Sequence, residues 1–288
     1  MIIRYFVIFA VFLITCTPKA QVISKTDTVS ADDHSRTAHV QVLTDSFPMT
    51  PLQGTRRIWV CLPPEYETSE RNYPVLYMQD GQNLFDRKTS FVGEWNIDET
   101  MATLPDSLQC IIVGIDNAGA DRAAEYAYYP NKKYHVEPRG QDYVQFITTH
   151  LKPAIDSLYR THSERESTYI GGSSLGALIA AFAVLENQPQ FGGALLFSPA
   201  YWFNPEIDEI AMFGEPQLRL RIYQVASQLE DNGSVAKHCT SMDSWLSSGN
   251  NELINMHTKI TEDGAHSEWF WAREFPEAIK WMMGGEEN

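Results

Sequence analysis

The sequence has few cysteines and a shortage of positive charge. Its 288 residues include only four cysteines, too few for a disulfide scaffold of this size. Lysine and arginine number 22 against 37 aspartates and glutamates, so the net charge is −15. A chain this acidic is poorly suited to nucleic-acid phosphates or to an anionic lipid surface. These shortages exclude a disulfide-rich module and disfavour a nucleic-acid-binding protein.

The N-terminus carries a short apolar run that predicts export. Arg4 precedes the almost wholly apolar residues 5–14, a run too short to cross a bilayer as a helix, which needs ~20 residues. A positive charge followed by such a run is typical of a secretory signal peptide. Residues 1–16 end in LITC, which resembles a bacterial lipobox with Cys16 as the lipidated first residue of the mature protein. Ordinary cleavage after Ala20, with Cys16 an unmodified residue of the signal peptide, is the alternative.

Behind this segment we expect a tether and one domain. Residues 17–38 are polar, rich in Thr, Ser and Asp, and without periodicity, which predicts a flexible tether. Residues 39–288 show no internal repeat and no second linker, so they should form a single folded domain. We therefore expect an exported protein that is periplasmic or anchored to the outer membrane, with any membrane contact made only through the N-terminal lipid.

Strand-like and helix-like segments alternate along the domain. Short apolar runs predict strands near residues 39–44, 56–62, 74–78, 110–115, 167–171, 193–197, 218–226 and 253–260. Longer segments predict helices at about 141–159, where Pro153 should cause a kink, and at 174–187, 234–248 and 267–283. This alternation predicts an α/β fold with a mostly parallel central sheet and helices on both faces. The first two strands have no helix between them, so they should form an antiparallel N-terminal edge.

One serine motif indicates chemistry. Gly172-Ser173-Ser174-Leu175-Gly176 has the form G-x-S-x-G, follows a strand-like run and precedes a small-residue helix. This is the context of a nucleophile elbow, a sharp turn that exposes a serine hydroxyl between a strand and a helix. Only Ser174 occupies the central position, and Ser173 is the alternative nucleophile. A glycine- and serine-rich turn without chemistry is the competing interpretation.

A serine nucleophile needs a base, and three histidines lie downstream of it. His238 falls in a predicted helix and His257 in a predicted strand. His266 falls in the loop between the last strand and the last helix, and loops at strand ends are where catalytic side chains converge. We therefore choose His266 as the base.

The base in turn needs an orienting carboxylate. In the α/β-hydrolase order, Ser precedes Asp or Glu, which precedes His. Glu230 and Asp231 both follow the strand predicted at 218–226 and both fit. Asp263 is weaker because it shares the loop of His266. We place Glu230 ahead of Asp231.

These residues and several other segments resemble the "putative esterase" (esterase D-like) family of α/β-hydrolases. Within that family the chain is most similar to the siderophore (trilactone) esterase-like branch. The matching segments are RRIWVCLPPEY (56–66), YPVLYMQDGQNLFD (73–86), GEWNID (93–98), IIVGIDN (111–117), LKPAIDSLYRT (151–161), GGSSLGAL (171–178), SPAYW (198–202) and HSEWFW (266–271). The resemblance implies the α/β-hydrolase fold and an ester-cleaving activity.

The resemblance also implies roles for individual residues. It places the nucleophile on Ser174, the base on His266 and the acid on Glu230, with Ser227 where the family's G-x-x-[D/E] pattern has glycine. The turn Asp80-Gly81-Gln82 looks like the oxyanion loop, so the backbone N–H groups of Gln82 and Leu175 would hold the oxyanion. Trp202, just after a strand end, is the candidate for a wall of the substrate pocket.

Taken together, the sequence predicts an exported serine esterase that works through an acyl-enzyme, without a metal or organic cofactor. The substrate would be a small-molecule or polysaccharide ester, of the siderophore-lactone or carbohydrate-ester type. An acyltransferase of the same fold and a non-catalytic binding lipoprotein are the alternatives.

Overall fold

The computed structural model describes residues 34–248 and 252–284. Within them the strands are β1 (Val40–Pro48), β2 (Thr55–Cys61), β3 (Val75–Gln79), β4 (Ile111–Ile115), β5 (Thr168–Ser173), β6 (Gly193–Phe197), β7 (Leu220–Ser227) and β8 (Ile254–Thr261). The α-helices are α1 (Ile97–Thr103), α2 (Arg122–Tyr126), α3 (Gly140–Phe146), α4 (Lys152–Leu158), α5 (Leu175–Glu186), α6 (Glu206–Phe213), α7 (Ser234–Leu246) and α8 (Glu268–Met283).

The strands form one sheet in the order β1-β2-β4-β3-β5-β6-β7-β8. The pairs β1–β2 and β2–β4 are antiparallel, and every other neighbouring pair is parallel. The mostly parallel sheet and its antiparallel N-terminal edge are therefore confirmed, and so is the α/β-hydrolase fold. Because β3 and β5–β8 run parallel, the loops that follow them gather at one edge of the sheet.

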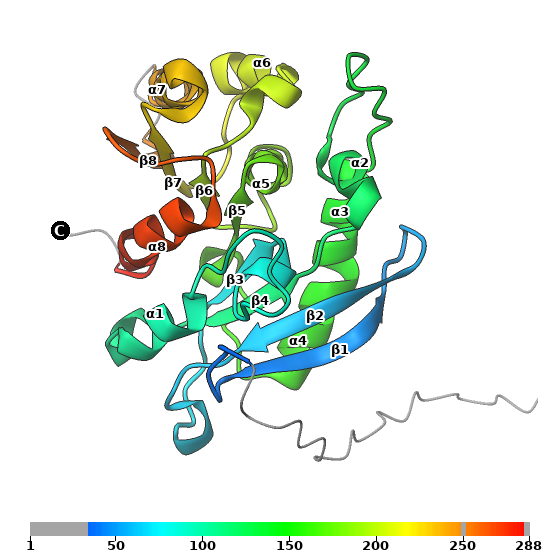
Figure 1. Ribbon diagram of the computed structural model, residues 1–288, viewed down its shortest axis with the longest axis vertical. Coiled ribbons are helices and arrows are strands. Elements are labelled where there is room, and N and C mark those ends of the chain that lie inside the picture. Colours follow the sequence, from blue (N-terminus) through cyan, green and yellow to red (C-terminus); the bar gives the residue numbers. More distant parts are fainter. Residues whose placement is uncertain (1–33, 249–251, 285–288) are drawn as a thin grey trace, which may run out of the picture. The chain divides into compact units, whose positions relative to one another are not determined.

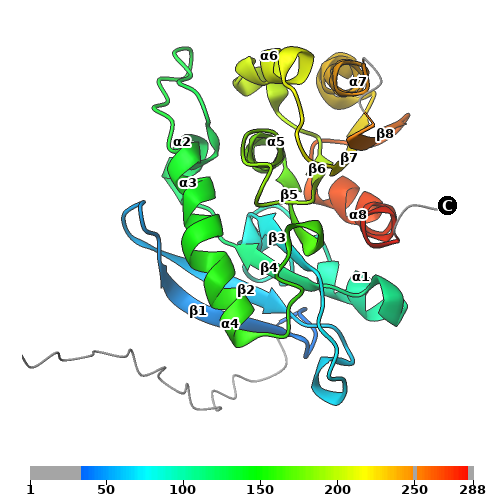
Figure 2. The same ribbon diagram turned by 180° about the vertical axis from the view of Figure 1, so that it is seen from behind.

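Helices cover both faces of the sheet, and each face has its own hydrophobic core. On one face, α1 and α8 bury side chains such as Ile97, Met101 and Phe275 against the sheet. On the other, α2 to α7 bury a larger set that includes Tyr143, Phe182 and Ile207. Figures 1 and 2 show these two layers from opposite sides. Helix α5 packs on β5 and β6 at the centre, which explains its nearly uniform apolar sequence.

The predicted helix at 141–159 is divided. A π-helical turn, Ile147–Leu151, separates α3 from α4. Pro153 lies at the start of α4, where its missing N–H and its ring disfavour regular α-helical bonding to the preceding turn. The wider turn just before it accommodates the proline. The short helices α1, α2 and α6 were not predicted from the sequence.

The cysteines of the described part of the chain are unpaired. Cys61, Cys110 and Cys239 are free and buried. Burial raises the pKa of all three thiols, so they remain protonated and packed as small apolar side chains.

The targeting segment and Cys16 lie outside the described residues. The expected tether reaches residue 38, and its described part, residues 34–38, binds the domain through residues 34–37. His34 pairs with Asp86, Ser35 donates to Glu94, and the backbone N–H of Thr37 donates to Asp98. Over residues 34–248 and 252–284, no helix has the length and apolar character needed to cross a membrane.

Candidate active site

Ser174 lies at a sharp turn between β5 and α5. Its backbone has φ 56° and ψ −120°, a region that costs a non-glycine residue about 1–3 kcal/mol. Two backbone bonds hold it there: the N–H of Ser174 donates to Phe197 at 3.0 Å, and the N–H of Ala200 donates to Ser174 at 3.1 Å. Strand β6 and the loop after it therefore clamp the serine in the strained conformation of a nucleophile elbow.

The two glycines of the motif let the turn pass close to the end of β3. A Cβ on Gly172 would lie 2.9 Å from the Cβ of Gln79, and a Cβ on Gly176 would also lie 2.9 Å from it. Real Cβ atoms essentially never come this close. The spacing G-x-S-x-G is thus explained by crowding on both sides of Ser174.

His266 and Glu230 are brought together by the loops after β8 and β7. Nδ1 of His266 lies 3.0 Å from Oε1 of Glu230. The imidazole is 42% exposed whereas the Glu230 side chain is 1% exposed. A buried carboxylate at Nδ1 fixes the orientation of the ring and leaves Nε2 for chemistry.

The Glu230 carboxylate is held in its charged form. Burial alone would raise its pKa, but hydrogen bonds from His266, from the Ser198 hydroxyl and from the Ser227 backbone outweigh it and lower the pKa. The Ser227 N–H donates to Oε2 at 2.8 Å. Ser198 is itself held by the indole N–H of Trp271 at 2.8 Å. Glu230 can therefore stabilise a positive charge on His266.

Asp231, the other candidate acid, points elsewhere. It is exposed, and its carboxylate accepts a hydrogen bond from the Ser234 hydroxyl at 2.6 Å. Its backbone is left-handed, with φ 44°, which turns its side chain away from the buried side occupied by Glu230. The geometry therefore favours Glu230 over Asp231.

Ser174 and His266 line one cavity of about 580 Å³. Phe91, Val92 and Trp271 form apolar parts of its wall. The complete lining is Asp80, Gln82, Asn83, Phe91, Val92, Asn117, Gly119, Arg122, Ser173, Ser174, His266, Glu268 and Trp271. Phe91 and Val92 are 89% and 70% exposed, so the loop that carries them presents apolar side chains at the mouth of the cavity.

Three charged residues for which the sequence predicted no role of their own also line this cavity: Asp80, Arg122 and Glu268. Arg122 forms two hydrogen bonds to Asp80, at 2.7 and 2.9 Å, and Asn117 donates to the same carboxylate at 2.7 Å. Glu268 is buried, and its pKa is raised, chiefly by burial and also by the charge of Asp80. Asp80 and Glu268 each lie within a quoted sequence segment, but nothing in those segments shows that they face Ser174.

Of the two residues expected to form the oxyanion hole, Gln82 lines this cavity and Leu175 directly follows Ser174 in the chain. Leu175 is the first residue of α5, where backbone N–H groups have no acceptor within the helix. Gln82 lies on the cavity wall in a 3₁₀ turn, Gly81–Asn83. Its side-chain oxygen accepts the N–H of Asn117 at 3.1 Å and its carbonyl accepts the Thr89 hydroxyl at 2.8 Å, so this turn is held rigidly.

Trp202 is not among the residues that line this cavity, contrary to expectation. It lines a separate hollow with residues 130–134 and 205–206. The chain after β6 turns in a 3₁₀ helix, Tyr201–Phe203, in which Tyr201 takes the buried position and leaves Trp202 51% exposed. Trp202 packs edge-on against Tyr134, with ring centroids 5.9 Å apart.

Comparison with known proteins identifies similar chains. The model of the family described as "Putative esterase" matches residues 50–282. Among curated proteins, "Uncharacterized protein YbbA" of Bacillus subtilis (strain 168) is 23% identical over 242 residues, which is 80% of this chain and 94% of that protein.

Two solved structures illustrate the structural similarity. The enterobactin esterase FES from Shigella flexneri superposes with a TM-score of 0.69 at 19% identity, over 88% of this chain and 61% of that one. The chain thus spans less than two thirds of the Shigella protein. An IroE-like serine hydrolase from Shewanella oneidensis superposes with a TM-score of 0.65 at 21% identity, over 85% of this chain and 79% of that one. At these identities the structures show a shared fold.

Proposed function

Since the chain belongs to the "Putative esterase" family and is an esterase of the α/β-hydrolase fold, we propose that it cleaves its ester with a Ser174-His266-Glu230 triad. One observation carries the proposal. The imidazole of His266 is oriented by a buried carboxylate at 3.0 Å and lines the same cavity as a serine in the strained elbow conformation.

The reaction proceeds in two acyl transfers. Nε2 of His266 takes the hydroxyl proton of Ser174 as the serine oxygen attacks the ester carbonyl. Glu230 stabilises the resulting imidazolium, which then protonates the departing alcohol. Water, deprotonated by the same imidazole, attacks the acyl-enzyme and releases the acid and free Ser174. These steps need no metal and no organic cofactor.

The oxyanion of each tetrahedral intermediate is assigned to the backbone N–H groups of Gln82 and Leu175. Leu175 supplies an unused donor and the positive end of the dipole of α5. Gln82 supplies a backbone donor, and its own side-chain oxygen and carbonyl oxygen both accept hydrogen bonds that hold the turn in place. Donors that are already oriented stabilise the developing charge without reorganisation.

The test is hydrolysis of p-nitrophenyl acetate and butyrate together with labelling by a fluorophosphonate. Ser174→Ala should lose labelling and lower kcat by roughly 10⁶-fold, as loss of a serine nucleophile does elsewhere. Ser173→Ala is the matched control: it changes the adjacent serine, which also lines the cavity, and should retain labelling. If the folded wild-type protein neither labels nor turns over, the serine mechanism is wrong and the binding-lipoprotein hypothesis replaces it.

The cavity and the family both support a proposal for the substrate class. The cavity volume of about 580 Å³ suits a small-molecule ester or one ester-bearing unit of a polysaccharide. We propose an ester of the siderophore-lactone or carbohydrate type, and a panel of trilactone, feruloyl and acetyl-sugar esters would identify it. Product analysis with added alcohols would detect transfer of the acyl group to an acceptor other than water.

We also propose that the protein is exported and carries a lipid on Cys16, as a periplasmic or outer-membrane-anchored lipoprotein. The proposal depends on the sequence of residues 1–16. Incorporation of a tagged fatty acid into wild type, and its loss in Cys16→Ala, would support it. Unlabelled periplasmic protein that starts at Gln21 would instead establish cleavage after Ala20.

A further inference from the structure

Three carboxylates gather at the start of α1, and none of them lines the cavity that contains Ser174 and His266. Glu94 precedes α1, and Asp98 and Glu99 lie in its first turn. One oxygen from each lies within 4.8 Å of the oxygens of the other two. Asp98 is 1% exposed, while Glu94 and Glu99 are half-buried and leave a path from solvent.

Two oxygens of this cluster are buried without a hydrogen-bond donor. They are Oδ1 of Asp98 and Oε2 of Glu99. The other oxygen of Asp98 accepts the backbone N–H of Thr37 at 2.6 Å, so its side chain is held in place with Oδ1 unsatisfied. Buried carboxylate oxygens almost always have a partner. Either a proton or a cation must fill the space between Asp98 and Glu99.

The charges around the cluster favour a positive ligand. One oxygen from each of the three carboxylates lies within 4.8 Å of the other two, so their negative charges repel one another when none is neutralised. A hard divalent cation bound by all three carboxylates would remove this repulsion.

We propose that Glu94, Asp98 and Glu99 form a Ca²⁺ site. Ca²⁺ binds six to eight oxygens, which carboxylates supply readily, and one oxygen of each of these three residues lies within 4.8 Å of those of the other two. Mg²⁺ is usually held by only one or two carboxylates, so a set of three favours Ca²⁺. Water would complete the coordination on the exposed side.

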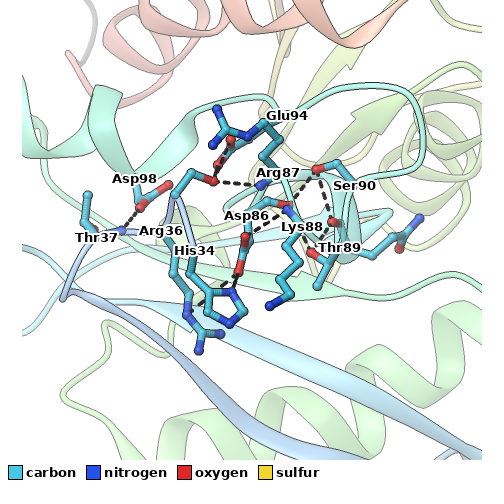
Figure 3. Close-up of polar contacts among 12 residues, drawn as sticks. His34, Arg36, Thr37, Asp86, Arg87, Lys88, Thr89, Ser90, Glu94 and Asp98 are labelled. Carbon is cyan, nitrogen blue, oxygen red and sulfur yellow. Dashed lines mark hydrogen bonds and ion pairs between the residues drawn. The ribbon is translucent and has the colours of Figure 1, made fainter. Parts of the chain in front are cut away.

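The site would join three segments of the chain. The N-terminal strap, residues 34–37, runs beside the loop that contains Asp86 and Glu94 (Figure 3). The Ser35 hydroxyl donates to both oxygens of Glu94, at 2.9 and 2.8 Å, and accepts the N–H of Arg87 at 2.7 Å. A cation here ties the strap and the loop to α1. The inference is independent of the proposed esterase mechanism.

The test is Ca²⁺ binding to the purified full-length chain after treatment with a chelator. Isothermal titration should show one Ca²⁺ per chain. About 10 mM Ca²⁺, some hundredfold above a Kd on the order of 10⁻⁴ M, should raise Tm by about 5–10 °C, and Mg²⁺ should raise it less.

Matched variants make the result specific. Glu99→Gln and Asp98→Asn should each weaken binding by roughly tenfold or more, and Glu99→Gln is the cleaner of the two because Asp98 also holds Thr37. Glu209→Gln, an exposed carboxylate on α6, and Ser174→Ala should bind Ca²⁺ like wild type. The proposal fails if Ca²⁺ leaves the Tm of wild type unchanged, if Glu99→Gln and Glu209→Gln respond equally, or if Mg²⁺ stabilises more than Ca²⁺.

Discussion

Replacing Glu230 by glutamine should abolish most of the activity and leave the fold intact. Both carboxylate oxygens are in use: Oε1 lies 3.0 Å from Nδ1 of His266, and Oε2 accepts the Ser227 N–H at 2.8 Å. A backbone N–H can only donate, so the amide oxygen of glutamine should face Ser227. Its NH₂ group then faces His266 and donates to Nδ1.

This exchange selects the wrong tautomer of His266. A ring whose Nδ1 accepts a hydrogen bond carries its proton on Nε2, the atom that has to receive the proton of Ser174. The imidazolium would also lose its buried negative neighbour. We expect kcat/KM to fall on the order of 10⁴-fold, or about 5.5 kcal/mol at 1.36 kcal/mol per factor of ten.

The assay is steady-state hydrolysis of p-nitrophenyl butyrate, with circular dichroism melting to confirm folding. Asp231→Asn is the matched control because its exposed side chain bonds only to the Ser234 hydroxyl in the described part of the chain; its rate should stay within about threefold of wild type. The reasoning is refuted if Glu230→Gln keeps more than a tenth of the wild-type kcat/KM, or if Asp231→Asn loses as much.

Two further predictions test the cavity wall and a buried acid. Trp202→Ala should leave kcat/KM on p-nitrophenyl butyrate within about twofold, whereas Phe91→Ala, at the cavity mouth, should raise KM severalfold; equal effects of the two in steady-state kinetics would contradict the placement. Burial raises the pKa of Asp116 to about 6, so folding favours its protonated form and wild type loses stability as pH rises from about 4 to 6. Asp116→Asn keeps an acceptor for the Trp59 indole N–H, 2.7 Å away in wild type, and should gain about 1–2 kcal/mol above pH 6. Urea midpoints should show no gain at pH 4, and an equal gain at both pH values would disprove the assignment.

Much of the fold could be predicted because the sheet is built from short, strongly apolar segments. Every strand from β1 to β8 lies on a predicted one. The central strands β3 to β6 are buried on both faces, which leaves little room for polar residues. Helices α1, α2 and α6 were missed because each is at most eight residues long, too short to show a clear periodicity. Packing against the sheet, rather than local propensity, stabilises them.

The site could be predicted only as far as topology decides it. Loops after parallel strands meet at one edge, and this brings Ser174, Glu230 and His266 to the same place. Topology does not tell which of two neighbouring residues faces the site. The left-handed backbone at Asp231 directs its side chain away from that of the buried Glu230. Similarly, Trp202 faces outward because its neighbour Tyr201 takes the buried position. The carboxylate cluster was missed because its partners, Ser35 and Thr37, are some sixty positions away along the chain.

Asn83 connects the cavity to this cluster. Its side-chain oxygen accepts the N–H of Phe91 at 3.0 Å, and its carbonyl accepts the N–H of Trp95 at 2.9 Å. Its amide donates to Glu268 at 3.3 Å, beside His266. Hydrogen bonds to Asn83, which lines the cavity, therefore hold both Phe91 and Trp95, the residue two positions before α1. Because Glu94 directly precedes Trp95, a ligand on the carboxylates and the N-terminal strap would both restrain the position of Phe91 relative to Ser174. The segment expected to be only a tether thus contacts the loop that shapes the substrate site.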